Sequence, residues 1–233
     1  GSEMCIRDSV VADLPEKIED TVMAQLTGEQ SKLYLANQDR IAQQVQHREA
    51  GEFKKDKLKV LAELTKLRQI CCDPRLHYED YKAGSAKLDT CMELVHGALD
   101  GGHRILLFSQ FTGMLDIIGK RLAKEDIAFL KLTGASSKES RAKMVAQFQA
   151  GEVPVFLISL KAGGVGLNLT AADVVIHYDP WWNVAAQDQA TDRAHRIGQQ
   201  HTVTVYKLIA KDTIEERIMQ MLSLIHISEP TRP

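Results

Sequence analysis

The sequence predicts an α/β protein built on a doubly wound parallel sheet, with a helical segment on its N-terminal side. The first observation is that short, almost continuous apolar runs follow one another through the second half of the chain. Strands that are apolar on both faces are typical of parallel sheets covered by helices on both sides. The second observation is that segments of helical periodicity separate these runs, as crossovers between parallel strands require. The expected strands are RILLF (104–108), AFLKL (128–132), VFLIS (155–159), VVIHY (174–178) and TVTVYKLI (202–209).

The connecting helices are expected near residues 113–124, 138–149 and 184–197, where apolar residues recur at helical spacing. Before the sheet, the polar region 27–72 also shows this spacing. We expect one or two amphipathic helices there, antiparallel and interrupted near Gly51. A further helix is expected over residues 87–99. The leucines that carry the earlier pattern are Leu58, Leu61, Leu64 and Leu67.

Composition indicates an ordinary globular protein: 233 residues with 44% hydrophobic residues are enough for one sizeable α/β domain and a smaller appendage. Lysine and arginine total 29 against 31 aspartate and glutamate, so any affinity for nucleic acid must come from local placement of charge. Four cysteines without metal-ligand spacing fit a reducing compartment. The sequence contains neither a membrane-spanning apolar run nor a signal peptide, and we expect a cytoplasmic protein without membrane contact.

Both ends of the chain read as foreign to the protein. LSLIHISEPTR (222–232) resembles a reading frame through the mosaic-end adapter of transposase-based sequencing libraries, and GSEMCIRD (1–8) resembles another frame of its reverse complement. We therefore expect residues 1–9 and 222–233 to derive from adapter sequence. The expected domains are a helical lead-in over 10–100 and an α/β domain over 101–221.

The loops that follow the strands are the first place to look for chemistry, because ligands of such sheets bind beyond the carboxyl ends of the strands. SLKAGGVGLN (159–168) offers glycines whose backbone N–H groups can approach an anion, beside a hydroxyl and a cation. The alternative is a tight connection, and the pattern is not a P-loop. The residues concerned are Ser159, Lys161, Gly163, Gly164 and Gly166.

Two further loops are candidates. In DPWWN (179–183), Trp182 with Asn183 could stack on a base or a sugar, although a loop tryptophan can equally cover the core. In TGAS (133–136), Thr133 and Gly134 form a pair common at phosphate contacts, or a plain turn.

The stretch QATDRAHRIGQQ (189–200) lies on the helix expected over 184–197. Gln189, Arg193 and Arg196 share one edge of that helix, about 100° from a thin apolar stripe. Two guanidinium groups at this edge suit a polyphosphate from outside the domain. The alternative is two solvated arginines paired with Asp188 and Asp192. The stripe consists of Ala186, Ala190, Ala194 and Ile197.

These segments resemble the SWI/SNF-related branch of superfamily two helicases. FLISLKAGGVGLNLTAADVVIHYDPWWNVAAQDQATDRAHRIGQ (156–199) is similar to motifs five and six of that family, and RILLFSQFTGMLDII (104–118) to motif four. LRQICCDP (67–74) and DLPEKIE (13–19) resemble the segments that lead into the second lobe. The resemblance covers nearly all of residues 12–221. It implies the second RecA-like lobe of an ATP-driven translocase on double-stranded DNA.

The resemblance also implies roles for single residues. Arg193 and Arg196 match the arginine fingers that reach the γ-phosphate held by the first lobe, and Gln189 matches the motif glutamine. Gly166 and Asn168 match the segment near the nucleotide. ATP and Mg²⁺ are the implied cofactors, both held mainly by the first lobe. The positions that match contacts to the DNA backbone, or supports for them, are Ser109, Gln110, Thr133, Gly134, Ser159 and Trp182.

The implied partners are double-stranded DNA, the first lobe of the same parent chain, and DNA-bound protein as a target of remodelling. The parent would be nucleoid-associated in bacteria and nuclear in eukaryotes. The sequence departs from the family pattern at Val184, where proline is common, and in lacking the first lobe with its P-loop. A fragment without that lobe is expected to be inactive alone. The alternative function is a non-catalytic nucleic-acid or protein-binding module that retains the fold.

Overall fold

The computed structural model describes residues 14–46, 53–162 and 166–228, and gives only the backbone for 53–56 and 226–228. Contacts within the chain divide it into two compact units. The first comprises residues up to 21, 94–177 and 183–207; the second comprises 22–93, 178–182 and the residues from 208 onward. The predicted adapter segment 1–9, residues 229–233 and the glycines Gly163 and Gly164 lie outside the described residues.

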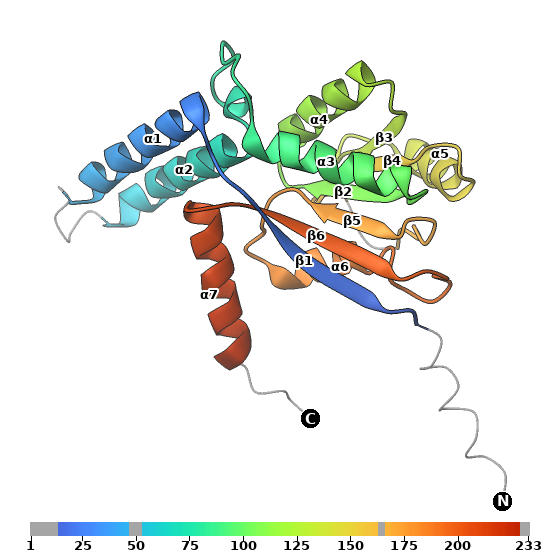
Figure 1. Ribbon diagram of the computed structural model, residues 1–233. Coiled ribbons are helices and arrows are strands. Elements are labelled where there is room, and N and C mark those ends of the chain that lie inside the picture. Colours follow the sequence, from blue (N-terminus) through green and yellow to red (C-terminus); the bar gives the residue numbers. More distant parts are fainter. Residues whose placement is uncertain (1–13, 47–52, 163–165, 229–233) are drawn as a thin grey trace, which may run out of the picture. The chain divides into compact units, whose positions relative to one another are not determined.

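Within the described residues the sheet has six strands in the order β1-β6-β5-β2-β4-β3, and they lie side by side in Figure 1. Strands β2 to β6 pair in parallel, with Leu107 opposite both Leu157 and Ile176. The predicted doubly wound parallel sheet is confirmed, and each expected strand is within a residue or two of its predicted bounds. The strands are β1 (Lys17–Ala24), β2 (Ile105–Ser109), β3 (Phe129–Leu132), β4 (Val155–Ser159), β5 (Val174–His177) and β6 (Val203–Ala210).

Strand β1 is an addition that the sequence analysis did not assign. It pairs with β6 in the same direction, because the Val203 amide donates to the Glu16 carbonyl (3.0 Å) and the Lys211 amide to the Ala24 carbonyl (2.9 Å). Most of its side chains are exposed. An exposed edge strand lacks the apolar pattern by which the other strands are recognised.

The helices of the first unit follow their predictions, except α6. Helix α4 (Thr112–Lys124) packs against β2, β3 and β4, and Gly119 brings it to the Phe129 ring, which a Cβ at that position would meet at 3.0 Å. Helix α5 (Lys138–Gln149) is capped at its N-terminus by Ser137, whose side chain accepts a hydrogen bond from the Ser140 amide. Helix α6 (Val184–Thr191) is shorter than predicted. The core beneath these helices is apolar, and every residue of β2 and β4 is buried.

The second unit contains the predicted antiparallel helices, which are confirmed. The Gln30 side chain of α1 (Gly28–Gln46) donates to the Ile70 carbonyl of α2 (Phe53–Cys72) at 3.0 Å, while Arg40 pairs with Glu63. The leucine spacing correctly predicts α2, but not a fully buried face. Leu67 is buried, whereas Leu58 and Leu61 are exposed. Further elements are a 3-10 turn (Pro74–Leu76), α3 (Ala86–Asp100) and α7 (Ile214–Ser228). Residues 86–93 of α3 belong to the second unit and residues 94–100 to the first.

A buried ion pair joins α3 to α7 within the second unit. Both Lys87 and Glu215 are fully buried, and the Lys87 Nζ lies 2.9 Å from each Glu215 carboxylate oxygen. Burial alone would lower the pKa of Lys87, but the Glu215 carboxylate, together with Cys72 and Asp179, outweighs burial and raises that pKa. The Ala210 amide also donates to Glu215, at 2.8 Å. The Lys87 ammonium and the Ala210 amide therefore satisfy the buried Glu215 carboxylate with hydrogen bonds.

Helices that could cross a membrane are absent from the part of the chain that the structure describes. The predicted domain boundary between residues 100 and 101 stays a prediction, as does the foreign origin of residues 222–228, which form part of α7.

We expect the Lys87→Met variant to lose about 3 to 5 kcal/mol of unfolding free energy, because it leaves the Glu215 carboxylate buried without its cation. Urea denaturation followed by circular dichroism measures this loss. Lys131→Met is the matched control, since Lys131 pairs with Asp116 at an exposed site and should change stability by less than about 1 kcal/mol. Equal effects of the two substitutions would contradict the assignment.

His177 should make the stability depend on pH. It is buried at the end of β5, stacks on Phe108 (5.5 Å between ring centroids) and places its Nε2 2.9 Å from the Thr191 hydroxyl. Burial, together with the positive charge of Lys207, lowers the pKa of His177 to about 3. His177 takes up a proton below about pH 6.5 in the unfolded chain but stays neutral in the folded chain. The free energy of unfolding therefore decreases as the pH is lowered from about 6.5 to about 3.

From this difference in pKa we expect His177 to lower the free energy of unfolding by about 2 kcal/mol between pH 7 and pH 5. Urea denaturation at both pH values should show a loss smaller by that amount in the His177→Gln variant. The exposed His201→Gln variant serves as the control and should lose as much as the unsubstituted chain. An equal loss for His177→Gln would show that His177 is not held neutral.

Candidate functional site

The two arginines predicted on a helix lie instead on a turn that follows it, and the predicted helix end at residue 197 is wrong. Helix α6 ends at Thr191, and the next hydrogen bonds, Arg193 amide to Ala190 carbonyl (3.3 Å) and Ala194 amide to Thr191 carbonyl (3.0 Å), span three residues only. The Arg193 carbonyl accepts from the Leu169 amide at 3.0 Å instead of continuing the helix. We refer to residues 192–198 as the arginine turn.

Gln199 fixes the end of the arginine turn. Its Nε2 lies 2.9 Å from the Ala194 carbonyl, 2.7 Å from the Ala172 carbonyl and 3.1 Å from the Thr170 carbonyl. Its Oε1 accepts from the amides of residues 200 and 201, at 3.0 Å each. Gln199 is 5% exposed, so one side chain satisfies several buried backbone groups. The sequence analysis missed it, because a glutamine after a glycine carries no charge or periodicity signal.

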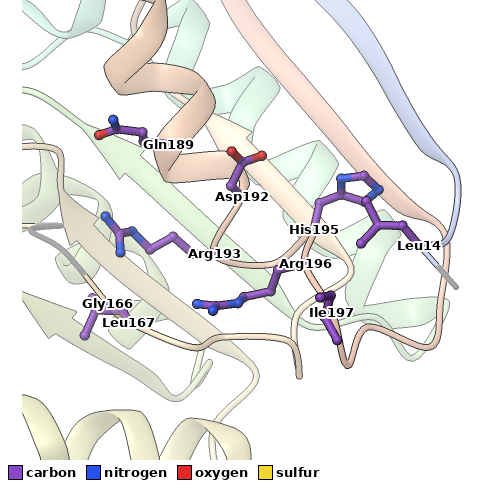
Figure 2. Close-up of a pocket in the computed structure, with 9 residues that line it drawn as sticks. All are labelled: Leu14, Gly166, Leu167, Gln189, Asp192, Arg193, His195, Arg196 and Ile197. Carbon is purple, nitrogen blue, oxygen red and sulfur yellow. The ribbon is translucent and has the colours of Figure 1, made fainter. Parts of the chain in front are cut away.

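The arginine turn forms one wall of a pocket of about 590 Å³. Figure 2 shows that the side chains of Gln189, Arg193 and Arg196 extend to the same side, and that Arg193 and Arg196 extend toward the segment of Gly166 and Leu167. The structure thus brings together three predicted residues and Gly166, although the helix that was to carry them ends early. Asn168 is exposed and does not line the pocket. The other lining residues are Leu14, Asp192, His195 and Ile197.

The predicted apolar stripe holds only in part. Ala190 and Ala194 are buried, but Ile197 is 76% exposed because it lies beyond the helix end. On the open side of the turn, burial and the neighbouring charge of Arg196 lower the pKa of Arg193, while Asp192 opposes this shift. Two guanidinium groups that share a pocket favour an anion between them.

Residues far earlier in the chain complete the pocket. The His195 Nε2 lies 2.7 Å from the Pro15 carbonyl, and Leu14 lines the pocket beside it. The segment that enters β1 is therefore attached to the arginine turn. The contact between His195 and Pro15 was not predicted, because 180 positions separate the two residues and no local pattern connects them.

The other predicted residues of the first unit lie at the carboxyl ends of neighbouring strands. Ser109 and Ser159 are opposite each other in the β2–β4 register, and both are buried. The Ser109 hydroxyl accepts from the Phe111 amide at 3.1 Å. Such buried serines can brace a loop more readily than contact a ligand. Gln110 is half-buried and Lys161 is exposed.

The TGAS loop is a tight turn held from α5. The Thr133 amide donates to the Ser136 hydroxyl (3.1 Å), while Gly134 is exposed. The Arg141 guanidinium of α5 donates to the Ser136 carbonyl (3.2 Å) and to the Ala162 carbonyl (3.3 Å). One side chain that the sequence analysis did not select therefore connects two of the predicted loops.

Asn183 has a clear structural role, since its side chain accepts from the Ala186 amide (3.3 Å) and caps α6. Trp182, in the second unit, is 45% exposed, so a large part of its ring is open to solvent. Among the described residues, no cluster of histidine, cysteine and carboxylate side chains could hold a metal ion.

Comparisons with known proteins agree with this architecture. Residues 86–198 match the family "Helicase conserved C-terminal domain". The chain is 41% identical over 225 residues to the "Putative ATP-dependent helicase/translocase YwqA" of Bacillus subtilis, covering 93% of this chain and 24% of that protein. The chain spans between 20 and 24% of the length of the curated relatives it matches along most of its residues.

Two solved structures are similar over nearly the whole chain. The "Sulfolobus solfataricus SWI2/SNF2 ATPase core in complex with dsDNA" is 37% identical with a TM-score of 0.78, covering 94% of this chain and 46% of that one. The "Sulfolobus solfataricus SWI2/SNF2 ATPase C-terminal domain" is 34% identical with a TM-score of 0.76, and the match covers 91% of this chain and 87% of that one. The chain therefore belongs to the SWI2/SNF2 ATPase family, as its C-terminal, RecA-like helicase domain.

Proposed function

We propose that this chain is the second motor lobe of an ATP-dependent translocase or remodeller that acts on double-stranded DNA. The observation that carries the proposal is the pocket that Gln189, Arg193 and Arg196 line together with Gly166. The described residues that line the pocket include two cationic groups, and the sequence contains no P-loop pattern, which is consistent with one wall of a nucleotide site. Two relatives, a putative ATP-dependent helicase/translocase and a SWI2/SNF2 ATPase core in complex with dsDNA, support the same assignment.

The residues present fit a polyphosphate. The lowered pKa of Arg193, caused by burial and then by Arg196, means that an anion in the pocket would stabilise both cations. Arg193 and Arg196 would stabilise the charge that develops on the transferred phosphoryl group, and Gln189 would orient groups beside it. ATP would supply the scissile phosphoryl group and Mg²⁺ would neutralise part of its charge, both bound mainly by the first lobe.

We propose that DNA lies along the loops at the carboxyl ends of the strands. Exposed Lys161, half-buried Gln110 and Thr133, and the backbone at Gly134 are suited to phosphate contacts, which fix register without reading sequence. Ser109 and Ser159 would brace these loops, and Trp182 would contact a sugar or base. The formal net charge of −2 means that affinity depends on these few placed groups.

In a two-lobe protein that contains this chain, we expect Arg193→Ala and Arg196→Ala each to leave ATP binding nearly unchanged while hydrolysis falls by roughly 10³-fold or more. The reason is that these groups would stabilise charge in the transition state rather than in the bound nucleotide. Steady-state ATPase assays and nucleotide-binding titrations measure the two effects. Arg121→Ala on α4 is the control, because Arg121 pairs with Glu125 away from the pocket. Unchanged turnover in both pocket variants would remove the arginine-finger assignment.

The chain by itself should not hydrolyse ATP, since it encodes one wall of the proposed site. We expect phosphate release from purified residues 10–221 to stay at the level of the buffer, with or without duplex DNA. Turnover at about 1 s⁻¹ or faster, which is typical of complete enzymes, would contradict the half-site assignment. A parent chain without a P-loop before this domain would instead favour the non-catalytic module.

A further inference from the structure

Arg68 is a buried charge in the last turns of α2. It is 6% exposed, and arginine is rarely buried to this extent unless other groups bind its guanidinium. Its Nη2 donates to the Pro180 carbonyl at 2.7 Å, and its guanidinium carbon lies 5.5 Å from the centroid of the Trp182 ring. Both contacts belong to the DPWWN loop (179–183), which is 112 positions away from Arg68.

The C-terminal end of α2 holds this segment at a second point. The Cys72 carbonyl accepts from the Tyr178 hydroxyl at 2.8 Å. Arg68 and Cys72 both belong to the last turns of α2, and Tyr178 and Pro180 are two residues apart in the chain. The two attachments therefore hold the chain that enters the DPWWN loop against this end of α2.

Trp182 is the exposed part of this arrangement. Its side chain is 45% exposed, whereas Asp179 and Pro180 just before it are buried. An indole that is held against a cation loses less freedom when a ligand stacks on it than an indole that rotates freely. Arginine suits this purpose better than lysine, because its planar fork can donate to a carbonyl while it also lies against a ring.

We propose that Arg68 is a positioning residue that holds Trp182 in place for a contact with a nucleotide of duplex DNA. The proposal rests on the proposed DNA-binding function. It gives α2 an indirect part in DNA binding, through the Trp182 ring that Arg68 holds. The ligand would be the sugar or base of a DNA strand, which stacks on the indole without regard to sequence.

The chain offers a direct probe, because its two tryptophans, Trp181 and Trp182, are both in this loop. In the Trp181→Phe background, fluorescence reports on Trp182 alone. We expect Arg68→Lys and Arg68→Gln to increase acrylamide quenching of Trp182 and to weaken binding of a short fluorescein-labelled duplex at low ionic strength. We expect the dissociation constant of the duplex to rise about two- to fivefold, as the loss of a cation–π contact at a partly exposed site implies.

Arg40→Lys is the matched control, because Arg40 binds α2 through Glu63 instead of through the loop. Arg68→Gln retains a donor for the Pro180 carbonyl without the cation, so a folded form is available if Arg68→Lys does not fold. Unchanged quenching in a folded Arg68 variant would overturn the positioning role. Increased quenching with duplex binding that is unchanged, or absent already in the Trp181→Phe parent, would support the positioning of the ring but overturn the DNA contact.

Discussion

The burial of β2 and β4 on both faces is the constraint on which the rest of the first unit depends. Leu106 and Leu107 alternate in direction, and both are fully buried, so helices must cover each side of the sheet. Parallel strands then place all of their carboxyl ends at one edge. The Ser109–Ser159 pair, the TGAS loop and the segment after β4 meet there because of this topology, and not because of any local attraction between them.

The sequence predicted the strands well because each is a short apolar run bounded by polar residues. It predicted the ends of α6 poorly, because alanine spacing continues through residue 194 while the backbone does not. The helix ends where the Leu169 amide binds the Arg193 carbonyl and the Gln199 side chain binds the Ala194 carbonyl. These are contacts between segments distant in sequence, and periodicity contains no information on them.

The candidate site was nevertheless predictable in its main residues. Gln189, Arg193 and Arg196 line one pocket whether the backbone is a helix or a turn, since spacings of three and four residues bring side chains to one side in both. What could not be predicted are the residues that support them. The Gln199 side chain binds backbone carbonyls at the end of the arginine turn, and the Pro15 carbonyl binds His195. In the second unit, the Lys87–Glu215 pair, which spans 128 positions, was equally unpredictable. Such groups have no local signature in a single sequence.

Two like charges in one pocket are costly unless something compensates for them. Asp192 compensates in part, since it opposes the lowering of the pKa of Arg193 that burial and Arg196 cause. Arg196 is exposed, so water screens part of its repulsion with the half-buried Arg193. An anion that enters the pocket would reduce the remaining repulsion. This arrangement suits the function proposed for Arg193 and Arg196, which is to act on a phosphate held by the first lobe.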